Sequence, residues 1–523
     1  MGTLLALALA SSCMASTAPQ DFRLVEVGRF RSGPFGRSAT EVAVHDAARQ
    51  RLLVVNAARG IDAVDIKDPA HPTLAGSFAA KGPTSVAVHG DVVAVLSAPE
   101  DRSKPGELIL LDADLKERAR IAVGHNPDMV TFTPDGKVLL VGNEGEEDPA
   151  SGTDPEGSIS VVDISEGPDR ARVRTADFRA FDAQRERLRA EGANLAVRGR
   201  TVAQQAEPEY VAVSPDGAMA FVTLQEMNAL AVVDVKSATV RSMHGLGLKD
   251  FSRCGLDPSD KDGGARIAPW PVVALRQPDT VVAWTEGGVT WLATSNEGEK
   301  RDTGASADAV RASELRLDAA AFSQSTPAIT AKDRLGRLEV CAPLCDTDGD
   351  GDADRLVAFG GRGVTIWRFD GTTLMEHWDS GAECERIVAE RSPGAFNADH
   401  EKGPSTDERS DAKGPEPEGL ATGLVNGRRL LFVGLERCGG VVAWDITDPA
   451  APRLLDYVNP RDAAVDLAKD GDKDGVPDDA ARAGDLGPEG LVFIPADASP
   501  SRKPMLAVCN EVSGTLTLWE VRA

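Results

Sequence analysis

The sequence has no continuous apolar run of about 18 residues, the length that a membrane-spanning helix needs. Basic residues are also few: 57 Lys and Arg stand against 82 Asp and Glu, which gives a formal net charge of −25. Such an acidic chain repels phosphate backbones and anionic bilayer surfaces. We therefore expect no transmembrane helix, no nucleic-acid partner and no polybasic docking to membranes.

The common enzyme signatures are missing as well. The sequence contains no Gly-x-Ser-x-Gly elbow, no phosphate-binding Gly-Lys-Ser/Thr loop, no dinucleotide fingerprint and no His-Glu-x-x-His pair. The 7 His residues are scattered, and no Cys/His cluster has zinc-finger spacing. These absences argue against the nucleophile, nucleotide and zinc chemistries that such motifs carry.

What the chain does contain is apolar sequence and many turn residues. Hydrophobic residues make up 42% of its 523 residues, which is enough to bury a core, and 51 Gly and 32 Pro provide turns. A chain of this length is expected to form several domains or one repetitive architecture.

Residues 1–20 resemble a secretion signal. The apolar run 4–10 is followed by Ser11, Ser12 and Cys13, although no Lys or Arg precedes it. The segment predicts an exported protein that is periplasmic, attached to the outer membrane or extracellular, with Cys13 as a candidate for lipid attachment. A plain N-terminal extension is the alternative. In an exported chain the other cysteines can form disulfides, and the turn-like spacer between Cys341 and Cys345 favours that pair.

Internal repeats are the strongest organisational signal. Most units read Pro-Asp/Glu, an apolar strand, a turn, a second strand that ends in Asn or Gln followed by Glu, and a third strand. Clear copies begin at Pro127, Pro208, Pro278, Pro417 and Pro488. Degenerate copies begin at Thr40 and Pro83, and a broken copy lies within residues 335–369.

We therefore predict an all-β fold, a single β-propeller over residues 21–523. Short strands with turns every 8–12 residues, repeated at about 40–45 residues, are typical of propeller blades. Eight units can be counted, but two are irregular, so seven or eight blades are both compatible with the sequence. The last unit lacks a fourth strand, which segment 22–30 is expected to supply, closing the ring. A non-closed β-sandwich is the alternative. Loop insertions are expected at residues 177–206, 245–277, 301–334, 380–414 and 460–487.

The repeat places carboxylates at two recurrent positions that open on one face of a propeller. The predicted channel mouth therefore gathers Asp128, Glu209, Asp279, Glu418 and Glu489 from the first position, and Glu144, Glu226, Glu297, Glu436 and Glu511 from the second. Crowded carboxylates raise one another's pKa unless cations or basic groups compensate. Basic residues predicted to border the mouth are Arg301, Arg409, Lys413, Arg437 and Arg461. Such a rim can hold divalent cations, or its acids can merely cap strand ends.

Two further acidic loops predict Ca²⁺ sites more directly. Asp346, Asp348, Asp350, Asp352 and Asp354 alternate with small residues, and Asp470, Asp472, Asp474 and Asp478 follow the same pattern. Both loops lack the Glu of a regulatory EF-hand at their twelfth position. The first is expected in a strand hairpin away from the mouth, and the second on the mouth side. A solvated acidic turn is the alternative for each.

Several segments resemble the choice-of-anchor I family across residues 22–522. They include FTPDGKVLLVGNEGE, TSNEGEKRD, DTDGDGDADRLVAFGGR, RSDAKGPEPEG and GLERCGGVVAWDITDPAAPR. The resemblance implies an exported β-propeller, similar to a mesenchyme-specific cell surface glycoprotein, and some members carry an alkaline-phosphatase label. Family members differ in their C-terminal anchors. This chain shows no sorting tail, so lipidation of Cys13 or free secretion is expected.

Two functional hypotheses follow. The first is a Ca²⁺-binding propeller that acts at the cell surface as a binding or adhesion module for an extracellular ligand. The second is a Ca²⁺-dependent phosphoesterase that cleaves a phosphate ester at the channel mouth. In that second hypothesis Glu209, Glu297, Glu418 and Glu489 hold Ca²⁺, which polarises the phosphoryl group and activates water. Glu297, Arg301 and Arg437 are the candidate catalytic residues, and the two arginines neutralise phosphate oxygens.

Overall fold

The computed structural model describes residues 22–33, 35–148, 151–301, 307–322, 326–471, 473 and 475–523. The predicted signal at residues 1–20, with Cys13, lies outside the described residues. No helix of the described chain is long and apolar enough to cross a membrane.

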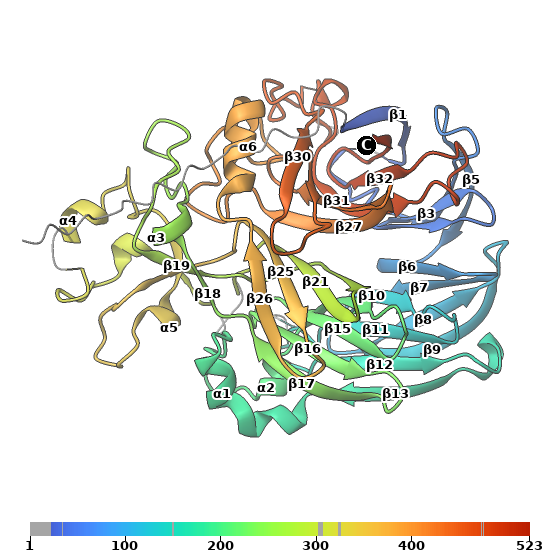
Figure 1. The fold of residues 1–523 in the computed structure, drawn as a ribbon, viewed down its shortest axis with the longest axis horizontal. Helices are drawn as coiled ribbons and strands as arrows, with labels where there is room; N and C mark the ends of the chain where they lie inside the picture. Colours follow the sequence, from blue (N-terminus) through green and yellow to red (C-terminus); the bar gives the residue numbers. More distant parts are fainter. Residues whose placement is uncertain are drawn as a thin grey trace, which may run out of the picture.

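Seven four-stranded antiparallel sheets make up most of the described chain (Figure 1). In chain order, and from first to fourth strand, the first sheet contains β2 (Ala43–Asp46), β3 (Arg51–Asn56), β4 (Gly60–Asp65) and β5 (Thr73–Ala79), and the second contains β6 (Pro83–His89), β7 (Val92–Ser97), β8 (Pro105–Leu111) and β9 (Glu117–His125). The third sheet contains β10 (Pro127–Phe132), β11 (Val138–Asn143), β12 (Ser158–Asp163) and β13 (Arg172–Asp177), and the fourth contains β14 (Pro208–Val213), β15 (Met219–Leu224), β16 (Ala229–Asp234) and β17 (Thr239–Gly245). The remaining three are β20 (Val281–Glu286), β21 (Val289–Asn296), β25 (Gly363–Phe369) and β26 (Leu374–Asp379); β27 (Pro417–Val425), β28 (Arg428–Leu435), β29 (Val441–Asp445) and β30 (Arg453–Val458); and β31 (Pro488–Ile494), β32 (Met505–Asn510), β33 (Thr515–Arg522) and β1 (Arg23–Arg31).

The turn between the first two strands shows why the repeat folds locally as it does. In the copy at Thr133, the Asp135 carboxylate accepts hydrogen bonds from the Thr133 hydroxyl (2.8 Å) and the Lys137 N–H (3.1 Å). Gly136 adopts a φ of 69°, and its counterpart Gly217 in the next sheet a φ of 71°. Only glycine adopts this left-handed conformation without strain, so the Pro-Asp-Gly sequence sets a tight turn between two strands.

The sheets pack face to face around a common centre. Hydrophobic clusters draw side chains from neighbouring sheets, as where Leu96 and Leu110 pack with Leu139 and Val141. The first strands contact one another in chain order from β2 to β31, and β31 also contacts β2. The first strand of each sheet is therefore innermost.

The N-terminal segment takes the place that the sequence predicts. Strand β1 pairs antiparallel with β33, from Arg23 opposite Arg522 to Arg31 opposite Thr515. The last sheet thus draws its fourth strand from the other end of the chain.

The broken repeat is not a separate four-stranded sheet. Its last segment forms β25, the third strand of the sheet that begins with β20 and β21. Its earlier segments form β23 (Glu339–Cys341) and β24 (Leu356–Ala358), which join β18 (Leu248–Asp250), β19 (Val272–Leu275) and β22 (Ala309–Arg311) in a five-stranded sheet. Among the described residues, seven of the eight counted units correspond to four-stranded sheets. The third strand of the broken copy completes the sheet of β20 and β21 across an insertion.

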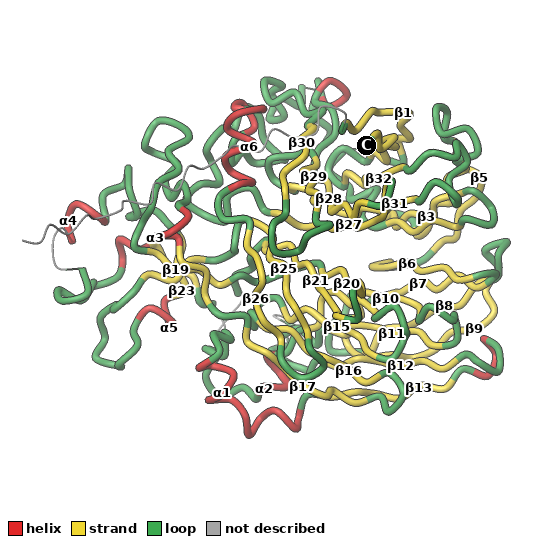
Figure 2. Tube along the Cα trace, viewed as in Figure 1, coloured by secondary structure: helices red, strands yellow, loops and turns green. Residues whose placement is uncertain are grey.

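The insertions form a lobe and several short helices beside the sheets (Figures 1 and 2). The five-stranded sheet has its own apolar core, which includes Phe251, Leu338 and Phe359. The helices are α1 (Arg185–Ala190), α2 (Val202–Gln205), α3 (Phe251–Cys254), α4 (Thr326–Ile329), α5 (Ala342–Cys345) and α6 (Glu383–Arg391). Short 3₁₀ turns are η1 (Pro168–Arg170), η2 (Arg179–Gln184), η4 (Ala312–Glu314), η5 (Pro393–Ala395) and η6 (Ala480–Arg482).

The favoured Cys341–Cys345 disulfide is wrong for this structure. The described cysteines are free thiols: Cys254, Cys341, Cys345, Cys384, Cys438 and Cys509. The thiol of Cys345 lies 3.3 Å from the carbonyl oxygen of Cys341, one helical turn away. Both side chains are packed in the apolar core of the lobe.

Asp257 in the lobe predicts a stability that falls with pH. Its fully buried carboxylate accepts the N–H of Arg266 (2.5 Å), and burial raises its pKa to about 7, with the negative charge of Glu385 adding to the shift. The folded state therefore holds a proton that the unfolded state releases near pH 4. The stability from that proton is complete at low pH and is lost as the pH rises through about 7.

Between pH 4 and pH 8, we expect the unfolding free energy of the wild type to fall by about 2–4 kcal/mol more than that of the Asp257→Asn variant. Urea unfolding at the two pH values measures the difference. The exposed Asp91→Asn variant serves as the control and should follow the wild type. Parallel pH dependence of the wild type and Asp257→Asn would refute the assignment.

Candidate functional site

The two recurrent acidic positions of the repeat lie beside each other in the structure. In four sheets the first strand starts with a Pro that an acidic residue follows, and this Pro pairs with the last residue of the second strand, as Pro127 does with Asn143 and Pro208 with Leu224. In each case the register then shifts by a β-bulge at the acidic residue that follows the Pro. A bulge re-aims a side chain and bends the strand. The bulge thus brings Asp128 next to Glu144, which follows Asn143.

A central cavity of about 410 Å³ is lined by residues in or just before the first strand of all seven four-stranded sheets. Its acidic lining residues are Glu41, Asp128, Asp279, Glu418 and Glu489, and Tyr210 contributes an aromatic ring. Four of these five acids belong to the predicted mouth. Glu41 is the acidic residue of the degenerate repeat at Thr40.

Burial and mutual repulsion shift the ionisation of these acids. Burial raises the pKa of Asp128 to about 7, with Asp279 contributing, and raises the pKa of Glu41 to about 8, with Glu511 contributing. Burial also raises the pKa of Glu418 and Glu489 well above the usual value, and neighbouring carboxylates add to both shifts. One oxygen of each of these two glutamates is buried with no hydrogen-bond partner. The cavity therefore favours positive charge.

Three carboxylates of the mouth form a close group without a basic partner among the described residues. One oxygen each from Asp128, Glu144 and Glu209 lies within 4.8 Å of the others. The Asn126 side chain donates a hydrogen bond to Glu144 (2.6 Å). None of the three acids forms an ion pair with a described residue. We call Asp128, Glu144 and Glu209 the carboxylate triad.

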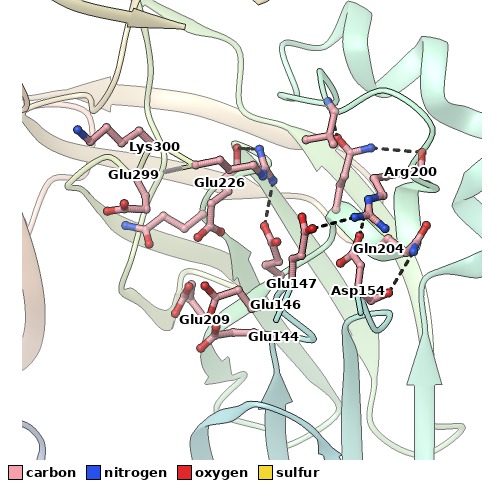
Figure 3. A pocket seen from close by; sticks show the side chains of 15 residues that line it. Glu144, Glu146, Glu147, Asp154, Arg200, Gln204, Glu209, Glu226, Glu299 and Lys300 are labelled. Carbon is pink, nitrogen blue, oxygen red and sulfur yellow. Dashed lines mark hydrogen bonds and ion pairs between the residues drawn. The ribbon is translucent and has the colours of Figure 1, made fainter. Parts of the chain in front are cut away.

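A side pocket of about 370 Å³ opens next to the triad (Figure 3). Glu144 and Glu209 line it together with Glu226, whose Oε2 is buried without a hydrogen-bond partner. On another wall the guanidinium of Arg301 pairs with Glu207 (2.9 Å). Arg200 pairs with Glu147 (3.2 Å) and Asp154 (2.9 Å).

Some other acids of the mouth, Glu297, Glu416 and Glu436, are compensated by basic groups. The Lys413 ammonium contacts Glu297 (2.7 Å), Glu416 (2.9 Å) and Glu299 (3.1 Å). The second oxygen of Glu297 accepts a hydrogen bond from Gln225 (2.9 Å). Burial acts against the charged form of Glu416, yet the positive charges around it, foremost Lys413, hold its pKa below the usual value. This part of the mouth is an ion-pair network.

Arg437 belongs to the same network. It pairs with Glu416 (3.4 Å) and Glu436 (3.3 Å), and its Nη1 donates to His400 Nε2 (2.7 Å). Burial and the charge of Arg437 lower the pKa of His400 to about 3, so the ring is neutral. Since Nε2 accepts this hydrogen bond, the ring proton is on Nδ1, which lies 3.4 Å from Glu436. A cation that needs the Nδ1 lone pair would have to displace that proton.

The remaining predicted basic residues differ in their contacts. Arg409 pairs with Glu416 at 2.6 Å. Arg461 instead donates to the main-chain oxygens of Arg437 (2.7 Å) and Asp399 (2.6 Å). One carboxylate oxygen of Glu511 lies within 4.8 Å of ligand atoms of His400 and Glu436. Glu511 also accepts a hydrogen bond from Ser38 (3.3 Å).

A family model described as the choice-of-anchor I domain matches residues 41–449. The chain belongs to this family. Gigasin-3a of Magallana gigas is 30% identical over 209 residues, which are 39% of this chain and 70% of that protein. The mesenchyme-specific cell surface glycoprotein of Strongylocentrotus purpuratus is 33% identical over 103 residues, 18% of this chain and 13% of that protein. The chain thus spans only a small part of the second relative.

Two solved structures align over most of the chain at TM-scores below 0.5. The β-propeller domain of Cps50 (Swd1) from Myceliophteria thermophila covers 95% of this chain and 100% of its own length, with 9% identity and a TM-score of 0.49. The alignment with hydrazine synthase from Kuenenia stuttgartiensis covers 93% of this chain and 97% of that chain, with 14% identity and a TM-score of 0.47.

The first calcium-like loop lies inside the matched choice-of-anchor I domain. It connects the antiparallel strands β23 and β24 of the lobe, as the hairpin prediction requires. Oxygens of Asp346, Asp348 and Asp354 lie within 4.8 Å of one another. Asp350 accepts the Asp352 N–H (3.0 Å), and Asp352 pairs with Arg316 (3.1 Å). Asp346, Asp348 and Asp354 also accept loop N–H groups, and together they offer three carboxylate ligands.

The second loop lies after the matched domain. Asp470 accepts the N–H of Gly475 (3.0 Å), and Asp478 accepts the N–H of Gly471 (3.0 Å). Asp472 and Asp474 lie outside the described residues.

Four residues of the mouth were not singled out from the sequence: Glu41, Glu207, Glu416 and His400. Glu207 and Glu416 directly precede the Pro of their repeats, so the Glu-Pro-Glu pattern was a signal that could have identified them. His400 lies in an insertion, and no spacing in the sequence connects it to Glu436.

Proposed function

We propose that this choice-of-anchor I domain is a closed seven-bladed β-propeller that binds Ca²⁺ and acts outside the cytoplasm as a binding module. The seven four-stranded sheets are the blades, and pairing of β1 with β33 closes the ring. The successive contacts of the first strands, including β31 with β2, support this arrangement. The name of the sea-urchin relative, a cell surface glycoprotein, supports an extracellular or surface location.

The observation that carries the calcium proposal is the carboxylate triad. Its donors are all carboxylate oxygens, which suit the hard cations Ca²⁺ and Mg²⁺, and Ca²⁺ accepts the less regular geometry. The three acids lack a basic partner among the described residues, whereas Glu297, Glu416 and Glu436 have Lys413 and Arg437. A bound Ca²⁺ would supply the missing positive charge. The Asp346–Asp348–Asp354 group is proposed as a second, peripheral site.

Isothermal titration calorimetry with Ca²⁺ tests the proposal. We expect one site that the Glu144→Gln variant loses and a second that the Asp348→Asn variant loses. Retention of all Ca²⁺ sites by Glu144→Gln would rule out the triad. Export is tested separately, by protease accessibility of the protein on intact cells.

The phosphoesterase hypothesis has less support from the geometry. The guanidinium groups of Arg301 and Arg437 are already paired with protein carboxylates, and both oxygens of Glu297 accept hydrogen bonds. Binding a phosphate ester there would require these buried pairs to open.

We therefore expect purified protein to hydrolyse p-nitrophenyl phosphate and its bis-ester no faster with Ca²⁺ than with EDTA. The Glu297→Gln variant should give the same background rate. Ca²⁺-dependent turnover that Glu297→Gln abolishes would instead establish the phosphoesterase.

A further inference from the structure

A second cleft lies between the helical insertion and the lobe. It is lined on one side by residues 195–200 and two arginines of α1, and on the other by the start of α5 and the loop 346–349. A smaller pocket continues along the end of α1 toward Leu344 and Arg355. Arg189 lines both.

The first wall is basic, in contrast to the rest of the protein. Residues 170–200 contain nine arginines and only four acidic residues, in a chain whose net charge is −25. Four of these arginines line the cleft: Arg185, Arg189, Arg198 and Arg200.

These arginines differ in how far they are neutralised. Arg200 is paired with Glu147 and Asp154. Arg185 donates only to the main-chain oxygens of Leu195 (3.2 Å) and Arg200. Arg189 has one long contact, 3.8 Å, with the exposed Glu186, and its own side chain is 48% exposed. Arg198 is exposed and forms no ion pair with a described residue.

The opposite wall carries the first calcium-like loop. Asp346 and Asp348 line the cleft. No ion pair joins these acids to the arginines across the cleft among the described residues, so a cavity of about 740 Å³ separates the two charged walls. Without a cation the two aspartates repel an anion in the cleft. With Ca²⁺ in the loop, that wall also becomes attractive to an anion.

We propose that this cleft binds a divalent oxyanion, a sulfate or phosphate-ester group, between Arg189 and Arg198 and the Ca²⁺-loaded loop. Guanidinium groups match such oxyanions with forked hydrogen bonds, and a Ca²⁺ ion accepts an oxyanion oxygen as a ligand. The calcium dependence of anion binding rests on the proposed Ca²⁺ site at Asp346, Asp348 and Asp354. The contacts of the anion with the arginines do not depend on that site.

Calorimetric titration with sodium sulfate, and separately with glycerol 2-phosphate, tests the proposal in excess CaCl₂ and in EDTA. We expect both anions to bind the wild type with Ca²⁺ and to bind at least about tenfold more weakly in EDTA. The Arg189→Ala/Arg198→Ala variant should lose at least about tenfold in affinity, since alanine cannot replace the charged hydrogen bonds of the two guanidinium groups. The matched control, Arg253→Ala/Arg391→Ala, removes the same charge from exposed sites elsewhere and should bind like the wild type.

Three results would overturn the proposal. Absence of binding by either anion removes the site, and unchanged affinity of Arg189→Ala/Arg198→Ala places the anion elsewhere. Equal affinity with Ca²⁺ and EDTA overturns the calcium coupling. In that last case, the Ca²⁺ stoichiometry of the Asp348→Asn variant shows whether the loop binds Ca²⁺ at all. Loss of one Ca²⁺ site would leave the proposed loop site intact, and an unchanged stoichiometry would overturn the loop site as well.

Discussion

The Asp128→Asn/Glu209→Gln variant is expected to be more stable than the wild type in EDTA at pH 8 and to gain no stability from Ca²⁺. Both substitutions keep the side-chain shape and remove negative charge from the carboxylate triad. Burial and the surrounding carboxylates disfavour the charged form of both acids, which is why their pKa values are raised. Without the ion, removal of that repulsion stabilises the fold. With the ion, two of its three carboxylate ligands are gone.

The wild type should behave in the opposite way. Saturating Ca²⁺ at about 100 times the dissociation constant adds about 2.7 kcal/mol to a fold that binds the ion only in its native state. Urea unfolding with Ca²⁺ and with EDTA measures both proteins. Asp91→Asn/Asp114→Asn removes the same charge from positions that are 86% and 80% exposed, and should retain the Ca²⁺ effect. A double triad variant that is still stabilised by Ca²⁺ to the wild-type extent would show that the ion binds elsewhere.

The Lys413→Met variant is expected to lose about 3–5 kcal/mol of unfolding free energy at pH 8, the cost of leaving buried charges without their partner. The Lys413 ammonium contacts three carboxylates and the main-chain oxygen of Gly298 (2.7 Å), and its side chain is 8% exposed. Glu416 beside it is fully buried. Methionine fills similar space but supplies no charge.

Two further variants separate the lost charge from lost packing. Lys413→Met/Glu297→Gln should recover part of the stability, because one of the unpaired carboxylates is then neutral. Lys104→Met removes an ion pair whose lysine is 67% exposed, and should change stability by less than about 1 kcal/mol. Urea unfolding measures all three. A Lys413→Met variant as stable as Lys104→Met would contradict a structural role for the network.

The strand pattern was predictable because it is encoded locally. The Pro-Asp-Gly turns, the apolar strands and the acidic residue after most initial Pro residues occupy fixed positions in a repeat, so they could be aligned by inspection. The pairing of β1 with β33 followed from counting strands in the last unit. The number of sheets did not follow, because residues 297–362 separate β21 from β25 and contain strands of their own.

The division of the mouth into two kinds of site was not predictable. In the sequence, Glu144 and Glu297 occupy the same position of the repeat, and each follows an Asn that ends a second strand. In the structure Glu144 meets Asp128 and Glu209, whereas Glu297 meets Lys413, which comes from the insertion between β26 and β27. No local sequence pattern predicts which carboxylate of the mouth an insertion will contact.

The sequence by itself determined that this is a repetitive all-β chain with carboxylates at two recurrent positions, since both properties depend on residues only a few positions apart. Only the tertiary structure decided how the net charge of −25 is distributed. Arginines and lysines of the insertions reach some carboxylates and not others, because those contacts join residues roughly a hundred positions apart, such as Lys413 with Glu297. The triad keeps its uncompensated charge, and four arginines of residues 170–200 line a different cleft.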